Sequence, residues 1–322
     1  MSLRGSRAMA LVVMFAAAPA CVPSSASTFR PVDAEVQRRL GLQAEWRAGS
    51  TDARVPAAVA ALLTNPLDRN AAVRIAIANS RRLQAEYEQV GIAAAAIADA
   101  TVLRPTEVDF NWKRNLSKAG DSETEVTVVQ DVLDLVQLGQ RRGVAGAELE
   151  AAQRRAVAAT VDLVARVEFA YYDVVAAQQE IDLRQTAFDA SAASAEIVER
   201  QHVAGNTTDL ALARERDMRE EARLALGEAQ AETEGHRETL NSLLGLSGDE
   251  TKWTIVDRLS KVPNQPPPLD DLEQVAVGEN LELAAIRSDA EAAAGRVGLA
   301  RVRAWLPEIG VGAAAADRKS VV

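Results

Sequence analysis

The sequence predicts a mainly α-helical protein, built on a long antiparallel coiled-coil helical hairpin with a two-stranded β-hairpin. Residues 137 to 246 form an almost continuous helical pattern that is interrupted only at residues 205 to 208. Aromatic residues make up 4% of the 322 residues and alanine is abundant, which favours packing of helix on helix over a large globular core. Residues 106 to 132 instead alternate apolar and polar side chains, as strands do.

The first 20 residues have the pattern of an export signal. Arg4 and Arg7 precede an apolar run at residues 8 to 18, which is too short to span a bilayer. Two outcomes fit: cleavage after Ala20 alone, or lipidation of Cys21 with cleavage at the same bond. The position of the only cysteine favours lipidation, whereas Ala18 stands where bacterial lipoprotein signals usually carry leucine. Either outcome takes the protein out of the cytoplasm.

Residues 21 to 69 are expected to form a tether and an irregular segment, because serine, proline and glycine recur there. A single helix is predicted at residues 70 to 101, and Pro105 follows its end. This helix opens a unit, residues 70 to 249, that also contains the β-hairpin and the helical hairpin.

Both strands of the predicted β-hairpin are amphipathic. The apolar face carries Val108, Phe110, Trp112, Val126 and Val128. The opposite face carries the acidic residues Glu107, Asp109 and Glu125. Apolar side chains outside and polar ones inside over about ten residues suit a strand of a membrane β-barrel, which needs strands from other copies to close its hydrogen bonds. The alternative is a soluble hairpin that packs on the helices.

The first arm of the helical hairpin, residues 137 to 203, would be roughly 100 Å long at about 1.5 Å per residue. Apolar residues from Leu163 to Phe188 alternate spacings of four and three, which is a heptad seam. A second row, from Val157 to Gln178, lies beside it, so the arm is expected to have helical neighbours on more than one side. The second arm, residues 209 to 246, is richer in alanine, which permits close approach of helices.

The turn between the two arms is the strongest candidate site. Gly205 can adopt the left-handed conformation that ends the first arm. Thr208 is placed to cap the second arm, and Asp209 lies at the positive end of that helix. These roles explain the turn by themselves.

The C-terminal part shows an internal repeat. Residues 250 to 268 form a proline-rich connector. Residues 276 to 285 then align with residues 76 to 85, and Pro307 takes the place of Pro105. Residues 269 to 322 are therefore expected to be the start of a second repeat, which is C-terminally truncated. Residues 317 to 322 do not continue the strand alternation.

Several classes of function are disfavoured. A net charge of −10 with no basic stripe argues against nucleic-acid binding. His202, His236 and Cys21 lack metal-ligand spacing, so no bound metal is expected. No nucleophile has catalytic partners and no phosphate loop is present, so we expect neither an enzyme nor a cofactor. The charged run at residues 214 to 223, together with Glu232, Glu234 and Glu238, is interpreted as a solvated helix face with ion pairs at a spacing of four, rather than as a tunnel lining.

From Leu62 to Gly312 the sequence resembles the TolC-type outer-membrane efflux proteins. The matching segments are Pro66-Leu67, Leu83-Gln84-Ala85, Tyr171-Tyr172-Asp173, residues 204 to 210, residues 237 to 246 and Leu306-Pro307-Glu308. Each segment is weak alone, and their order and spacing carry the resemblance. It implies a homotrimer that shares one outer-membrane β-barrel and builds a periplasmic tunnel from helical hairpins.

The resemblance also implies a function, that of a passive channel subunit in tripartite efflux or type I secretion-like export. Such a channel docks on a periplasmic adaptor protein and an inner-membrane transporter. The protein would lie in the bacterial outer membrane, with its apolar strand face toward lipid and its acidic strand face toward the lumen. The residues expected to dock the adaptor, or else only to make the turn, are Arg200, Val203, Gly205, Asn206, Thr208, Asp209 and Leu210. The alternative function is a periplasmic coiled-coil adaptor or scaffold protein, which would also show a long hairpin.

Overall fold

The computed structural model describes residues 24–47, 54–102, 107–114, 122–131, 133–261, 271–305 and 310–319. The chain divides into two compact units. One comprises residues 1–32, 88–156 and 277–322, and the other comprises residues 33–87 and 157–276. The long helix α6 (Leu133–Val203) contributes to both, and each unit is described by itself below.

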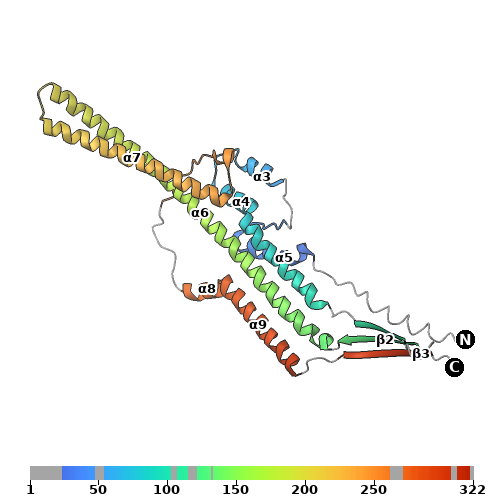
Figure 1. The fold of residues 1–322 in the computed structure, drawn as a ribbon. Coiled ribbons are helices and arrows are strands. Elements are labelled where there is room, and N and C mark those ends of the chain that lie inside the picture. Colours follow the sequence, from blue (N-terminus) through green and yellow to red (C-terminus); the bar gives the residue numbers. More distant parts are fainter. Residues whose placement is uncertain are drawn as a thin grey trace. The chain divides into compact units, whose positions relative to one another are not determined.

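The helical hairpin is the main element of the unit that holds residues 157–276. Helix α6 has 71 residues, which is about 107 Å at the usual rise, and the 36-residue helix α7 (Asp209–Leu244) returns antiparallel to it after a short turn (Figure 1). The seam residues Leu163, Val167 and Val174 are buried. Farther toward the turn, Ile181 and Phe188 are only half-buried. The predicted mainly helical fold with a long hairpin is confirmed, and Ile181 and Phe188 of its seam stay partly exposed in a single chain.

Polar contacts fix the base of this hairpin. Tyr171 is fully buried on α6, and its hydroxyl donates to the Leu67 carbonyl (3.2 Å) and to Asp257 Oδ2 (2.5 Å). Burial, followed by the hydrogen bond to Asp257, raises the pKa of Tyr171 well above its usual range. The Arg237 guanidinium lies 3.9 Å from the centre of the Trp253 ring, a cation–π contact. Tyr171, the first residue of the Tyr-Tyr-Asp motif, therefore has a structural role here.

Two helices replace the single one predicted at residues 70 to 101. Helix α4 (Arg69–Asn79) ends at Ser80, and α5 (Arg81–Thr101) starts directly after it. Ser80 has extended backbone angles (φ −68°, ψ 107°), and its hydroxyl accepts a hydrogen bond from the Leu83 N–H (3.2 Å). The serine thus caps the second helix locally, although the apolar pattern continues across the break.

The segment expected to be irregular, residues 21 to 69, contains two helices, α2 (Ser25–Leu40) and α3 (Arg54–Leu62). Phe29, Val32 and Val36 are buried on one side of α2 at spacings of three and four, as in an amphipathic helix. Pro31 lies inside α2. The first 20 residues and Cys21 lie outside the described residues.

The other unit contains a three-stranded antiparallel sheet instead of an isolated hairpin. Strand β2 (Ser122–Asp131) pairs with β1 (Glu107–Arg114) on one side and with β3 (Gly310–Lys319) on the other (Figure 1). The predicted β1–β2 hairpin is confirmed. Residues 317 to 319, which did not fit the strand alternation, still pair with β2. In the register, Lys319 lies opposite Ser122. Backbone pairing requires no alternation of side chains.

The last helices are α8 (Leu272–Glu279) and α9 (Leu281–Trp305). A Cβ at Gly295 of α9 would overlap the Val144 side chain of α6, so the absence of a side chain permits this close approach. Gln140 Nε2 donates to the Gly295 carbonyl (3.2 Å), and Arg296 pairs with Glu148 (2.9 Å). Within the described ranges, no helix combines the length and apolarity that a bilayer crossing needs.

Candidate functional site: an amphipathic sheet and a hairpin tip

Strand β1 presents large apolar side chains to solvent. The exposed fractions are 63% for Val108, 67% for Phe110 and 57% for Trp112. Exposed apolar clusters of this kind are uncommon on soluble monomers and mark contact with a membrane or another protein.

The strand register extends this apolar face over all three strands. Val128 lies opposite Val108, and Val126 lies opposite Phe110. Since directly opposed residues share one face of a sheet, the predicted apolar set lies together. Strand β3 continues the face with small residues, because Ala313 lies opposite Val128 and Ala315 lies opposite Val126.

The acidic set lies on the opposite face. Glu107 and Asp109 alternate with the apolar residues of β1 and are exposed, and Glu125 lies opposite Asn111. The structure therefore separates the two predicted sets by face. Contact of one face with lipid and of the other with a channel lumen stays a prediction.

The sheet has two open edges in the part of the chain that the structure describes. Strands β1 and β3 each pair only with β2, so each leaves one row of backbone groups without a strand partner there. A sheet with an apolar outer face and open edges can bind further strands, and in lipid it must do so.

The second candidate region is the turn that joins α6 to α7. Gly205 has a φ of +76°, a conformation that favours glycine. Its N–H donates to the His202 carbonyl (2.9 Å), and the Asn206 N–H donates to the Gln201 carbonyl (2.8 Å). These two bonds form a Schellman motif, which ends α6 as the sequence predicts.

The start of α7 is capped by the predicted residue. Thr208 Oγ1 accepts a hydrogen bond from the Ala211 N–H (3.2 Å). Asp209 lies in the first turn, where its negative charge suits the helix dipole, and its Oδ1 is 2.6 Å from His202 Nε2 of the other arm. The cap and the pair of side chains close the turn locally.

Apolar side chains at this turn are open to solvent. Val203 is 84% exposed and Leu210 is 62% exposed, whereas Leu212 is buried between the arms. Arg200 is exposed and pairs with Glu196, one helical turn earlier. The predicted tip residues thus form one partly apolar end of the hairpin, and docking of an adaptor there stays a prediction.

Sequence reasoning missed polar contacts between the two arms. Arg216 of α7 pairs with Glu199 of α6, and Ser194 Oγ donates to Glu215 Oε2 (2.7 Å). The charged run therefore pairs partly across the hairpin. Along α7, Arg219 pairs with Glu220 (2.8 Å) and Arg223 pairs with Glu220 (2.9 Å), at spacings of one and three, whereas Glu232 has His236 at the predicted spacing of four (3.7 Å). Only complementary charge on both arms could have suggested the pairing across the hairpin.

The described residues contain no group of three or more His, Cys, Asp or Glu side chains placed to hold a metal ion. His202 has Asp209 beside it, and His236 has Glu232 at 3.7 Å. Cys21 lies outside the described residues, so its lipidation stays a prediction.

Comparison with known proteins found structural likeness only. No family model and no curated protein sequence matches the chain. Its structure is similar to the Campylobacter jejuni CmeC outer membrane channel, with 15% identity and a TM-score of 0.60 over 79% of this chain and 61% of that one. For the outer membrane protein VceC from Vibrio cholerae the identity is 15% and the TM-score is 0.58, over 79% of this chain and 68% of that one.

A third similar structure is the outer-membrane channel OprN. The identity is 15% and the TM-score is 0.62, over 85% of this chain and 67% of that one. The chain spans 61% of the length of CmeC, so the likeness covers part of such a channel. The predicted resemblance is confirmed at the level of architecture, and the chain has the fold of these outer-membrane channels.

Proposed function

We propose that the protein is an outer-membrane channel subunit of an efflux or export system. The observation that carries the proposal is the combination, in one chain, of a channel-like fold with a sheet whose aromatic and aliphatic face is exposed on β1. In a soluble adaptor, Phe110 and Trp112 would be exposed to water, which is unfavourable for large apolar side chains. In a membrane strand, such side chains lie in lipid.

In this proposal the acidic face of the sheet lines a water-filled lumen. Glu107, Asp109 and Glu125 then give the passage a negative potential, which raises the local concentration of cations. The conduit itself is passive in this proposal.

The proposed assembly is a homotrimer. Each chain offers three described strands, and the smallest membrane barrels have about eight, so at least three copies are needed to close one. The half-buried distal seam of α6 leaves room for helices of neighbouring copies. The hairpin tip docks a periplasmic adaptor protein, which in turn contacts an inner-membrane transporter.

Conductance in planar lipid bilayers tests the channel proposal. The purified full chain is expected to give discrete current steps with a preference for cations in a potassium chloride gradient. Glu107→Gln together with Asp109→Asn should lower that preference and leave the step frequency unchanged. Absence of steps from protein that fractionates with the soluble periplasm would contradict the proposal and would fit the adaptor or scaffold alternative.

A further inference from the structure

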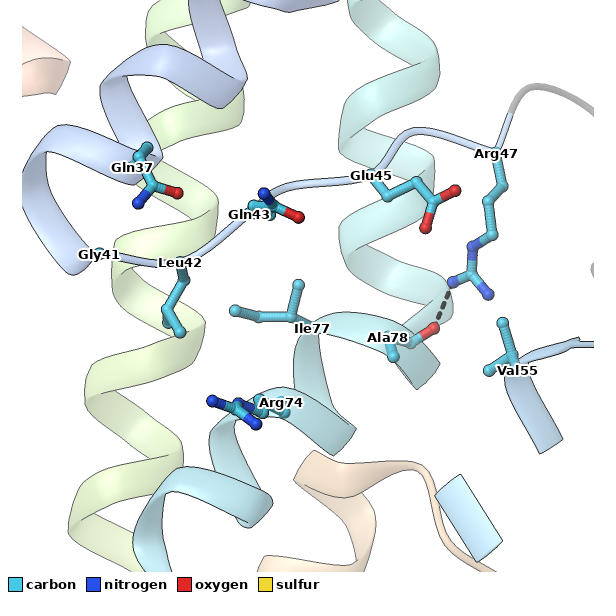
Figure 2. A pocket seen from close by; sticks show the side chains of 10 residues that line it. All are labelled: Gln37, Gly41, Leu42, Gln43, Glu45, Arg47, Val55, Arg74, Ile77 and Ala78. Carbon is cyan, nitrogen blue, oxygen red and sulfur yellow. Dashed lines mark hydrogen bonds between the residues drawn. The ribbon is translucent and has the colours of Figure 1, made fainter. Parts of the chain in front are cut away.

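A pocket lies in a part of the chain that is separate in sequence from the sheet and the tip. It is a pocket of about 410 Å³ within the unit that holds residues 33–87. The lining residues come from α2, α3, α4 and the loop after α2: Gln37, Gly41, Leu42, Gln43, Glu45, Arg47, Val55, Arg74, Ile77 and Ala78 (Figure 2). Its size is in the range of small-molecule sites.

Hydrogen bonds hold the loop that forms one wall of the pocket. The Ala44 N–H donates to Asp33 Oδ1 (2.8 Å) on α2. At the other end of the loop, the Arg47 N–H donates to Gln84 Oε1 (3.0 Å), and Gln84 Nε2 returns a hydrogen bond to the Glu45 carbonyl (3.0 Å). The wall is therefore fixed before any ligand arrives, which lowers the entropy lost on binding.

The two arginines of the lining differ in what they already bind. The Arg47 guanidinium donates to the Ala78 carbonyl, near the end of α4, where helix carbonyls need donors (Figure 2). Arg74 has no hydrogen-bond or ion-pair partner among the described residues and is exposed. Its guanidinium is therefore available to an anion from outside the chain.

The lining is also polarised. Arg74 lies at one end, Glu45 and Arg47 lie at the other, and Ile77 lies between them, with Leu42 on the side away from Glu45 and Arg47 (Figure 2). In a chain of net charge −10, this lining carries two arginines and one glutamate. A guanidinium matches the two oxygens of a carboxylate or a phosphate.

We propose that this pocket binds a small molecule with an oxyanion, a carboxylate or a phosphate, on a short aliphatic body. Arg74 binds the oxyanion, and Leu42 and Ile77 contact the aliphatic part. The site is independent of the proposed channel function, because binding needs only the packing of α2, the loop and α4.

Isothermal titration calorimetry of the full chain in neutral detergent tests this site. The probes are hexanoate, hexyl phosphate, inorganic phosphate and hexanol. Saturable binding of hexanoate or hexyl phosphate is expected, and comparison of the two identifies the preferred oxyanion. Inorganic phosphate and hexanol should each bind at least about tenfold more weakly, since each lacks one half of the ligand.

Variants locate the binding. Arg74→Gln should weaken the favoured probe by about tenfold, the loss of one charge-assisted contact. Arg214→Gln, a matched change at an exposed arginine of α7, should leave the affinity unchanged. The bound probe should also slow hydrogen exchange of the Leu42 and Gln43 amides. Failure of both hexanoate and hexyl phosphate to bind would overturn the proposal. So would equal affinity of the favoured probe for the Arg74 variant and the parent protein.

Discussion

Glu35 of α2 binds two arginines of its own helix. Its Oε2 accepts from Arg38 Nε (2.8 Å), and its Oε1 accepts from Arg38 Nη2 and from Arg39 Nε (both 2.6 Å). The Arg38 hydrogen bonds, followed by that of Arg39 against an opposing desolvation, lower the pKa of Glu35 from 4.5 to about 2. Because the folded state favours the charged form, this cluster stabilises α2 above pH 4.5, and the contribution disappears as the pH falls to about 2.

Glu35→Gln is expected to destabilise α2 at pH 7 by about 1 kcal/mol, near the upper end for a partly exposed ion pair. The difference should vanish near pH 2, where the native carboxylate is also losing its charge. Hydrogen exchange of α2 amides, corrected for intrinsic rates at each pH, measures the effect. Arg38→Gln removes the same pair from the other side and should follow the same pH window. An undiminished difference between Glu35→Gln and the parent protein at pH 2 would exclude this origin.

At the scale of elements, the helices and strands with a repeating side-chain pattern were the ones that the sequence could predict. The seam of α6 and the alternation of β1 repeat over many residues, so both elements could be recognised without tertiary information. The α4–α5 break could not, because its cap is a single hydrogen bond that the Ser80 hydroxyl accepts from the Leu83 N–H. Helix α2 was missed because the serine- and proline-rich composition of residues 21 to 69 suggested a tether, although the spacing of Phe29, Val32 and Val36 carried the signal.

The candidate sites follow the same division. The tip was predictable because Gly205, Thr208 and Asp209 act through local backbone geometry. The pairs across the hairpin and the Arg74 pocket were not, because their members meet only after the chain has folded.

The exposed apolar tip leads to a prediction for the hairpin as an element. Leu210→Asp places a charge where Leu210 would contact the adaptor, and should lower co-purification of a co-expressed periplasmic adaptor by about tenfold or more. Leu224→Asp is the matched control, since Leu224 is 64% exposed on the same helix but lies 14 residues farther along. Equal losses in both variants, or none in Leu210→Asp, would count against a docking role for the tip.

At the scale of the whole molecule, the sheet and the hairpin favour different surroundings. The apolar face of β1 is stable only when it is covered by lipid or by protein, whereas helix α7 carries many exposed charged side chains. A chain that spans from lipid into water has both surroundings. In the proposed channel, association through the open edges of the sheet would link membrane insertion to oligomer formation.

Two neighbouring substitutions test this link. Phe110→Asp introduces a carboxylate on the apolar face of β1, and Asn111→Asp introduces the same group on the opposite face. A charged side chain on the lipid face costs up to about 2–4 kcal/mol for Arg or Lys and less for a carboxylate, whereas a lumen residue remains hydrated. Phe110→Asp should therefore reduce the protein recovered in the outer-membrane fraction and the trimer seen by mass photometry in detergent, and Asn111→Asp should preserve both. If the two variants behaved alike, the face of the strand would not matter, and the sheet would have to be covered by protein on both sides instead of by lipid on one.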